Sequence, residues 1–425
     1  MNNTIYDTIV IGAGQAGLAA GYHLQQAGLR FVILEASDEP VGSWPHYHDN
    51  LALNSPARYS SLPGLPFPGD PNRYPVRDEV TAYLRHYATH FKLPVITKAK
   101  VLNIEQTGKL FRVLVAGRGC YLARTIVAAT GFFHHPNIPI LPGRDQYRGR
   151  VLHTAAYHTP EPFHGQRVVI VGGANGAVHI GMELAQVANV TLSTQRPIRY
   201  LPQNLLGQDI HFWLRLTGLD NRQWLGEKSM LVYDSGEVKA KIAAGRPDQK
   251  ALFQSFTPDG VMWSDGHREK VDAVIFGTGY RPHLPYLAGL GALDETERVL
   301  HQRGVSTTVP GLYYVGLIRQ RSVASTTLRG AGVDAQVVVK HLRRYALAQQ
   351  ASGGRSITHK AHAWAIRSSE WAGLITMMRL ALKEQHNTSP RLVGEALVRS
   401  AVVSAGFLGL GSATRLYSTF ESGNW

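Results

Sequence analysis

The sequence contains a single cysteine, Cys120, among its 425 residues. One thiol excludes a disulfide framework, a multi-cysteine metal site and the redox-active dithiol of disulfide reductases. Long apolar runs are also scarce, because the longest late stretch, residues 401–411, is too short and too rich in glycine to span a bilayer. Residues 1–7 lack the basic segment of a secretory signal. We therefore expect a cytoplasmic protein with no stable membrane insertion.

Charged residues make up only 17% of the chain, yet the formal net charge is +14. The lysines and arginines are scattered, with no run of five or six, and no basic-aromatic motif for nucleic acid is present. Because the positive charge is dispersed, anionic cofactors and a solvated surface explain it better than nucleic acid does. The length favours two or three domains, and the 43 glycines indicate many tight turns or close backbone approaches.

Residues 5–35 carry the complete fingerprint of a dinucleotide-binding unit. We predict a buried strand at 5–11, a helix at 18–27 and a second strand at 31–34. Gly12 permits the tight turn, Gly14 lets a pyrophosphate approach the backbone, and Gly17 lets helix and strand pack closely. The helix N-terminus offers N–H groups to the phosphates. The first set of candidate cofactor-binding residues is therefore Gly12, Gly14, Gln15, Ala16, Gly17 and the ribose-binding acid Glu35.

A second fingerprint follows, with strands predicted at 167–171 and 190–193 and a helix at 178–188. Ala174 replaces the middle glycine, and its methyl group crowds the pyrophosphate approach. No acid follows the second strand; Arg196 and then Arg199 stand there instead, and arginine suits a 2′-phosphate. The sequence thus favours NADPH over NADH, with a solvated surface role as the alternative for both arginines. The candidate turn residues are Gly172, Gly173, Asn175 and Gly176.

Two fingerprints predict two dinucleotides, and FAD with a nicotinamide cofactor is the usual pair. Two apolar strands, 121–129 and 271–276, end in the turns Thr130-Gly131 and Thr278-Gly279, and we expect both to belong to the first domain. A β-meander is expected at 95–120. Another strand at 311–316 ends on Gly316 and precedes a helix at 333–345 whose N-terminus could face the flavin. The predicted fold is α/β with two Rossmann-like domains, the second inserted in the first: 1–159 (FAD), 160–270 (NADPH), 271–345 (FAD) and a helical C-terminal extension at 346–425.

Several motifs together resemble the flavin-containing monooxygenase superfamily of class B flavoproteins. The stretch Tyr147–Tyr157, with His153 at its centre, is similar to the family's linker signature, although Tyr147 replaces the usual Phe. Gly42-Ser43-Trp44 resembles the Gly-x-Trp element near the flavin. The 55–64 segment and the run Thr327-Leu328-Arg329-Gly330 most resemble small bacterial FAD/NADPH flavoproteins of arsenic-resistance and metal-transport gene neighbourhoods. The signature ends in Tyr157, whereas type I Baeyer–Villiger enzymes end it in Trp.

The resemblance implies an activity. NADPH would reduce FAD, O2 would form a C4a-(hydro)peroxyflavin, and one oxygen atom would pass to a small hydrophobic organic substrate by N or S hydroxylation or Baeyer–Villiger insertion. Asn54 is the candidate for the flavin-facing asparagine, or a loop-capping residue. Arg321 is a candidate for a bond to the oxygenated flavin or nicotinamide, or a surface residue. We expect His153 mainly to hold the linker, and Trp44 either to stack on the flavin or to lie in the core.

Three classes of function remain open: a monooxygenase, a disulfide reductase, and a non-catalytic redox sensor that binds FAD and NAD(P)H. The lone Cys120 argues against the second. A metal site at His46, His48, His134 and His135 lacks acidic or cysteine partners at ligand spacing, so we expect no metal. The substrate pocket is expected at 50–68 and 204–218. Helices are expected at 359–385 and 391–408, and these could shape a substrate tunnel, form a homodimer contact or pack on the surface.

Overall fold

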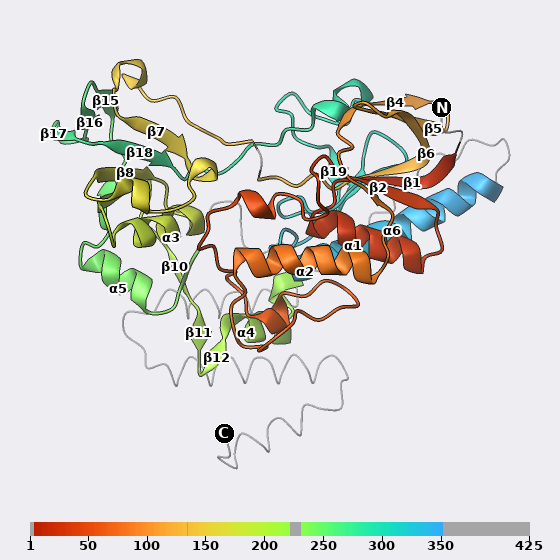
Figure 1. The fold of residues 1–425 in the computed structure, drawn as a ribbon, viewed down its shortest axis with the longest axis horizontal. Helices are drawn as coiled ribbons and strands as arrows, with labels where there is room; N and C mark the ends of the chain where they lie inside the picture. Colours follow the sequence, from red (N-terminus) through yellow and green to blue (C-terminus); the bar gives the residue numbers. More distant parts are fainter. Residues whose placement is uncertain (1–3, 134, 222–230, 352–425) are drawn as a thin grey trace, which may run out of the picture. The chain divides into compact units, whose positions relative to one another are not determined.

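A computed structural model describes residues 4–133, 135–221 and 231–351 (Figure 1). Two sheets built around parallel strands, with helices packed on them, form most of this part of the chain. The α/β prediction is confirmed. The helices expected at 359–385 and 391–408 lie outside the described residues.

The first sheet is organised around β1 (Ile5–Ile11), which pairs in parallel with β2 (Phe31–Leu34) and β6 (Gly119–Ala128). Both faces of a central parallel strand are covered, and β1 is accordingly an almost continuous apolar run. Its buried Thr8 hydroxyl is satisfied by the Thr125 hydroxyl of β6 at 2.9 Å. The order is β19-β20-β21-β6-β1-β2-β3, with β4 and β5 continuing from β6. The other strands are β3 (Val95–Ile96), β4 (Val101–Thr107), β5 (Leu110–Val115), β19 (His301–Gln302), β20 (Val305–Ser306) and β21 (Leu312–Tyr314).

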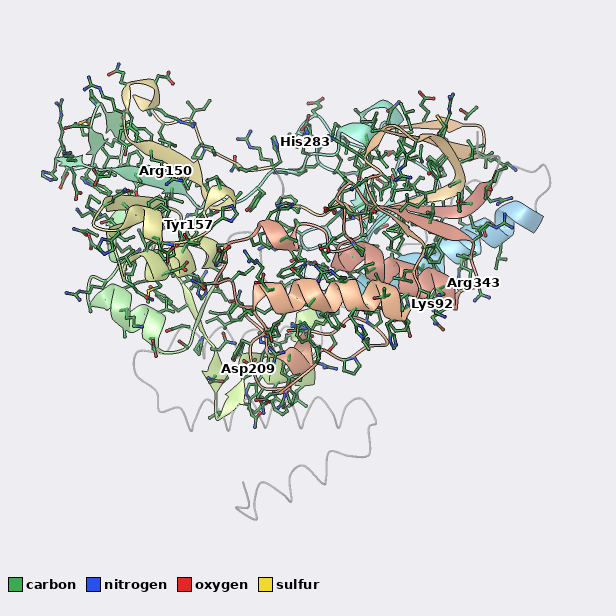
Figure 2. All side chains as sticks on the ribbon, viewed as in Figure 1. Lys92, Arg150, Tyr157, Asp209, His283 and Arg343 are labelled. Carbon is green, nitrogen blue, oxygen red and sulfur yellow. The ribbon has the colours of Figure 1, made fainter. Side chains whose placement is uncertain are left out.

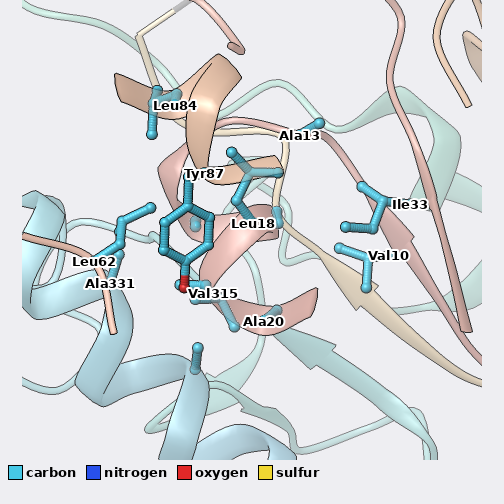
Figure 3. Close-up of a cluster of buried hydrophobic side chains, with 14 of the residues drawn as sticks. Val10, Ala13, Leu18, Ala20, Ile33, Leu62, Leu84, Tyr87, Val315 and Ala331 are labelled. Atoms are coloured by element: carbon cyan, nitrogen blue, oxygen red, sulfur yellow. The ribbon is translucent and has the colours of Figure 1, made fainter. Parts of the chain in front are cut away.

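One apolar cluster joins this sheet to α1 (Gln15–Gln26), α2 (Arg77–His90) and α6 (Leu328–Ala351). Figure 3 shows part of it, with the ring of Tyr87 surrounded by apolar side chains. The Tyr87 hydroxyl donates to the Pro63 carbonyl at 2.6 Å, so burial leaves no unpaired donor there. The helix predicted at 333–345 is longer than expected. It begins at Leu328, inside the Thr327–Gly330 run, and extends to Ala351. The opposite face of the sheet is covered by β4, β5 and β6, which form an antiparallel meander, and by residues 284–293. The meander expected at 95–120 is therefore present, but it includes β6 and not β3.

The second sheet has the order β14-β9-β8-β18-β7, and all its pairs are parallel. Its strands are β7 (Arg150–His153), β8 (Arg167–Val171), β9 (Asn189–Thr194), β14 (Asp248–Ala251) and β18 (Ala273–Phe276). The helices α3 (Asn175–Leu184) and α5 (Glu237–Ala243) belong to this domain. Smaller sheets pair β10 (Tyr200–Pro202) with β13 (Val232–Asp234), and β15 (Ser255–Thr257) with β16 (Gly260–Met262) and β17 (Arg268–Lys270).

One strand was predicted in the wrong sheet. The sequence analysis placed residues 271–276 in the first domain, whereas β18 lies between β7 and β8 of the second sheet. A fully buried parallel strand has the same apolar pattern in either sheet, so its pattern carries no information about its partners. β7, which precedes residue 160, also belongs to the second sheet. We propose that the inserted domain runs from β7 to β18 and not from 160 to 270.

Residues 204–217 belong to a separate compact unit. A short hairpin of β11 (Asn204–Leu205) and β12 (Gln208–Asp209) leads into α4 (Ile210–Leu216), whose N-cap Asp209 accepts the His211 N–H at 2.8 Å. The chain also contains short 3-10 helices: η1 (Trp44–His46), η2 (Ala57–Tyr59), η3 (Arg144–Gln146), η4 (Thr154–Ala156), η5 (Glu161–Phe163), η6 (Leu219–Asn221) and η7 (Pro285–Leu290). In the part of the chain that the structure describes, no helix has the length and apolar character needed to cross a membrane.

Candidate functional site

A cavity of about 420 Å³ lies in the first domain, where the glycine-rich turn follows β1. It gathers segments that are far apart in the sequence, including the ends of β2 and β6 and the start of α6. Ten of the predicted cofactor-binding residues line it: Gly12, Gly14, Gln15, Ala16, Glu35, Gly42, Ser43, Thr130, Gly131 and Gly316. The first fingerprint, the Gly-x-Trp element and the Thr-Gly turn therefore meet at one place.

Glycine is required where backbones approach at this cavity. Gly12 has φ +98°, and a Cβ there would lie 2.6 Å from the Ala129 carbonyl oxygen. At Gly42, with φ +60°, a Cβ would lie 2.7 Å from the Gly14 Cα. Gly17 does not line the cavity, but a Cβ there would meet the Gly12 oxygen. Glycine backbone along this wall fits a ligand that is bound by main-chain N–H groups, such as a pyrophosphate.

Glu35 is buried at the end of β2 and fixes the turn. Its Oε2 accepts the Ala13 N–H at 2.5 Å, and its Oε1 accepts the N–H and hydroxyl of Ser37, both at 2.9 Å. A carboxylate has about four acceptor positions, so three protein donors leave capacity for a ribose hydroxyl. The acid of the fingerprint thus has a structural role in addition to the ligand contact predicted for it.

The structure places Trp44 behind the cavity wall, in the apolar core. Its indole N–H donates to the Gln15 side-chain oxygen at 2.6 Å, and Gln15 in turn donates to the Thr326 carbonyl at 3.1 Å. This chain of bonds joins the start of α1 to the segment before α6. Leu328 is likewise buried at the first position of α6, and the cavity wall there is formed by Ser325, Thr326 and Ala331.

The aromatic and imidazole side chains that line the cavity were not among the predicted residues: Tyr47, Phe132, Phe133, His283 and Tyr286. Burial, opposed by a hydrogen bond from Ser43 and reinforced by Tyr280, raises the pKa of Tyr47 to about 12, so its hydroxyl stays protonated near neutral pH. That hydroxyl is 2.8 Å from the Ser43 hydroxyl. His283 lies on the segment that returns from the second sheet (Figure 2). The available signals were the position of Tyr47 just after Gly-x-Trp and the two phenylalanines just after Thr130-Gly131.

The turn after β8 carries the glycines of the second fingerprint. Gly172 has φ +144°, and a Cβ there would lie 2.4 Å from the Gly277 oxygen. Gly173 faces the segment after β9, since a Cβ there would be 3.4 Å from Thr194 and from Ile198. A Cβ at Gly176 would meet nothing within 4 Å. Asn175, a predicted cofactor-binding residue, connects α3 to β13 through its side chain, which accepts the Tyr233 N–H at 3.0 Å and donates to the Leu231 carbonyl at 3.2 Å.

Arg196 and Arg199 are exposed and follow β9, on the segment that Gly173 faces. If they bind the 2′-phosphate of NADPH, the double variant Arg196→Ala/Arg199→Ala should raise KM for NADPH by roughly 30-fold, since two charge-assisted hydrogen bonds are lost. KM for NADH, which has no 2′-phosphate, should change by less than about twofold. Initial rates of flavin reduction with each nucleotide measure both values. Equal losses with NADPH and NADH would contradict the assignment.

His153 is buried at the end of β7 and holds two loops together. Its Nδ1 accepts the Ala155 N–H at 3.0 Å, so the proton resides on Nε2, which donates to the Gly279 carbonyl at 3.0 Å. Burial lowers the pKa of His153, and the bond to Gly279 opposes that shift. Both ring nitrogens are used by the backbone, which supports the structural role expected from the sequence.

Thr278 and Gly279 connect the two segments by which the chain passes from the first domain to the second and back. The Thr278 hydroxyl donates to the Asn137 carbonyl at 2.5 Å, and the Asn137 N–H donates to the Gly279 carbonyl at 2.9 Å. Asn137 lies on the outgoing segment and Gly279 on the returning one. The second Thr-Gly turn therefore joins the linkers, whereas Thr130-Gly131 lines the cavity.

Asn54 and Arg321 do not line the cavity. The Asn54 carbonyl accepts a bond from the Gln203 side chain at 3.1 Å. Arg321 is 10% exposed, and its guanidinium pairs with the fully buried Asp334 of α6 at 2.8 Å. Among the described residues, no group of three or more His, Cys, Asp or Glu could hold a metal ion, and His134 lies outside them.

Comparisons with known proteins assign the family. Residues 9–316 match the model of the pyridine nucleotide-disulphide oxidoreductase family. An uncharacterized CzcO-like oxidoreductase of Geobacillus kaustophilus is 33% identical, over 80% of this chain and 98% of the relative. An indole-3-pyruvate monooxygenase of Oryza sativa, YUCCA4, is 28% identical over 79% of this chain and 86% of its own.

Among solved structures, a flavin-containing monooxygenase from Stenotrophomonas maltophilia is 34% identical, with a TM-score of 0.72, and the match covers 80% of this chain and 98% of the other. The resemblance inferred from the motifs is confirmed. The chain belongs to the pyridine nucleotide-disulphide oxidoreductase family and to the class B flavin monooxygenase superfamily, and it is a flavin-dependent oxidoreductase that uses FAD and NADPH.

Proposed function

We propose that this protein transfers one oxygen atom from O2 to a small hydrophobic organic molecule. The balanced reaction takes substrate, O2, NADPH and a proton to oxygenated substrate, NADP+ and water. The oxygen enters either at a soft N or S atom or beside a ketone carbonyl. Bound FAD supplies the chemistry that passes two electrons from NADPH to O2.

The observation that carries this proposal is the lining of the cavity in the first domain. It combines the glycine-rich turn with aromatic side chains at Tyr47, Phe132 and Phe133 and contains no thiol. Cys120 lies instead at the start of β6, where its sulfur is 3.3 Å from the Arg112 Nε. Electrons that leave the flavin therefore have no dithiol to reduce, and an apolar aromatic wall favours an organic substrate.

The protein's own residues bind and orient the two cofactors and exclude water from the cavity. The turn at Gly12 and Gly14 offers backbone N–H groups to the FAD pyrophosphate, and Glu35 offers acceptors to its ribose. Tyr47, which stays protonated, is a hydrogen-bond donor or acceptor inside the cavity. The half-buried Phe132 would restrict water next to it. Arg196 and Arg199 would neutralise the 2′-phosphate of NADPH.

The test uses the purified protein with FAD bound. The protein is reduced with NADPH without oxygen and then mixed with oxygenated buffer in a stopped-flow spectrometer. We expect a transient near-ultraviolet absorbance that differs from that of both reduced and oxidised flavin. With 18O2 and a panel of ketones, sulfides, amines and indole-3-pyruvate, one labelled oxygen should appear in a product. Panel members that gain oxygen beside a carbonyl identify Baeyer–Villiger insertion.

Direct reoxidation with stoichiometric peroxide and no labelled product from any panel member would contradict monooxygenation. Such a result would favour an FAD- and NAD(P)H-binding reductase. Failure of NADPH to reduce the flavin at all would favour a redox sensor.

A further inference from the structure

Glu183 lies in the last turn of α3, and its carboxylate connects three segments of the chain. Tyr157, the final residue of the linker signature, donates its hydroxyl hydrogen to Oε2 at 2.9 Å. Asn50, in the loop that leads from η1 toward α2, donates its amide to Oε1 at 2.5 Å. One carboxylate of the second domain thereby binds Tyr157, which packs in the core of the same domain, and a loop of the first domain. No motif in the sequence marks this residue.

The loop held by Glu183 is also fastened at its other contacts. The Asp49 N–H donates to the His158 carbonyl at 3.0 Å. Arg77, at the start of α2, donates to the Tyr47 carbonyl at 2.8 Å and pairs with the Asp49 carboxylate at 2.5 Å. Tyr47 lines the cavity of the first domain, so these bonds connect the loop that carries Asn50 to a residue at that cavity.

The groups around this carboxylate suit a permanent contact. Tyr157 is 1% exposed, and burial together with the nearby Glu183 charge raises its pKa, so it remains a donor at neutral pH. Burial, reinforced by His179, lowers the pKa of the neighbouring His48 to about 4, so that imidazole adds no positive charge near neutral pH.

We infer that Glu183 is a positioning residue for hydride transfer from NADPH to FAD. The opposite end of α3 carries the turn that receives the nicotinamide dinucleotide, at Gly172 and Gly173. Glu183 fastens the other end of the same helix to the loop that carries Tyr47. A rigid helix held at both ends fixes the nicotinamide site relative to the flavin cavity, and hydride transfer depends steeply on that separation. This inference rests on the two cofactor sites of the proposed function but not on oxygen transfer.

The test is the anaerobic reduction of bound FAD by NADPH in Glu183→Ala. We expect the limiting rate constant to fall by about tenfold, because two hydrogen bonds to a charged acceptor are lost. FAD content and the Kd of NADP+ should change by less than about twofold, since Glu183 does not line the cavity of the first domain and lies at the end of α3 away from the Gly172 turn. Backbone hydrogen exchange of residues 47–51 should become faster. These readouts precede any reaction with oxygen, so they stand even if no product is oxygenated.

Two partner variants and one matched control make the test specific. Asn50→Ala and Tyr157→Phe should each slow reduction by about threefold, and Asn50→Ala should add nothing in the Glu183→Ala background. Asn50 is exposed, so its variant keeps the test available if Glu183→Ala folds poorly. Glu237→Ala removes an exposed acid of α5 that pairs with Lys241, and it should leave reduction unchanged. An unchanged rate in Glu183→Ala, or additive effects of Glu183→Ala and Asn50→Ala, would overturn the inference.

Discussion

Gly12→Ala should yield a protein that is purified without FAD. A Cβ at this position would lie 2.6 Å from the Ala129 oxygen, and the residue would keep φ +98°, which L side chains rarely adopt. Relief requires β1 and β6 to separate where the cavity begins, and this would move Gly14 away from the pyrophosphate. We expect FAD binding to weaken by at least about 100-fold, since backbone strain and lost phosphate contacts add. The ratio of absorbance at 450 nm to that at 280 nm measures FAD content.

Gly289→Ala provides the matched control for this variant. Gly289 lies in η7, where an added Cβ would meet nothing within 4 Å, and its φ is not positive. It should bind FAD like the unaltered protein. A Gly12→Ala variant that retains full FAD would show that the turn tolerates a methyl group and that the phosphates are bound elsewhere.

Asp334→Ala should lower the free energy of unfolding by about 3 kcal/mol, because it leaves the guanidinium of Arg321 without this carboxylate partner in a buried position. The Asp334 side chain is fully buried and that of Arg321 is 10% exposed. The pair also holds the segment after β21 against α6, where Ser325 and Thr326 line the cavity. Thermal unfolding should show a Tm lower by roughly 6 to 12 °C.

The double variant Arg321→Met/Asp334→Met distinguishes a structural role of Arg321 from a role in the reaction. Burial raises the pKa of Asp334 despite the opposing effects of Ser325 and Arg321, so desolvation of the carboxylate outweighs its pairing. Replacing both charges by apolar groups should therefore restore Tm to within about 3 °C of the unaltered protein. If flavin reduction and product formation recover as well, Arg321 has only a structural role. Recovery of stability without recovery of product formation would support a role for Arg321 in the reaction itself.

The residues around the glycine-rich turn of the first domain could be expected at one cavity from the sequence, because the physics of that turn is local. Gly12 is required by backbone geometry, Gly14 is expected where a pyrophosphate approaches the backbone, and Glu35 follows from the length of one βαβ unit. The wall that faces them could not be predicted in the same way. Tyr47 and His283 reach the cavity through loops whose path depends on long-range packing, and their residue types occur on many surfaces.

Two interpretations show where local patterns stop being informative. The strand at 273–276 has the apolar pattern of any buried parallel strand, and only its pairing with β8 reveals its sheet. Trp44 belongs to a motif found near flavins, yet its indole donates to Gln15 from within the core. In both cases the sequence identified the element correctly, and tertiary contacts decided what it touches.

The hydrogen bonds of Asn137 to Thr278 and Gly279 have a consequence for how such a chain can be altered. They bring the point where the chain leaves the first domain next to the point where it returns, and the bridge between Pro136 and Tyr280 keeps the two strands of the crossing in register. A segment whose two ends meet can be replaced by another of different length without straining its host. Residues 138–277 therefore form a natural cassette, and exchanging them between relatives should transfer the preference for one nicotinamide dinucleotide while leaving the flavin domain intact.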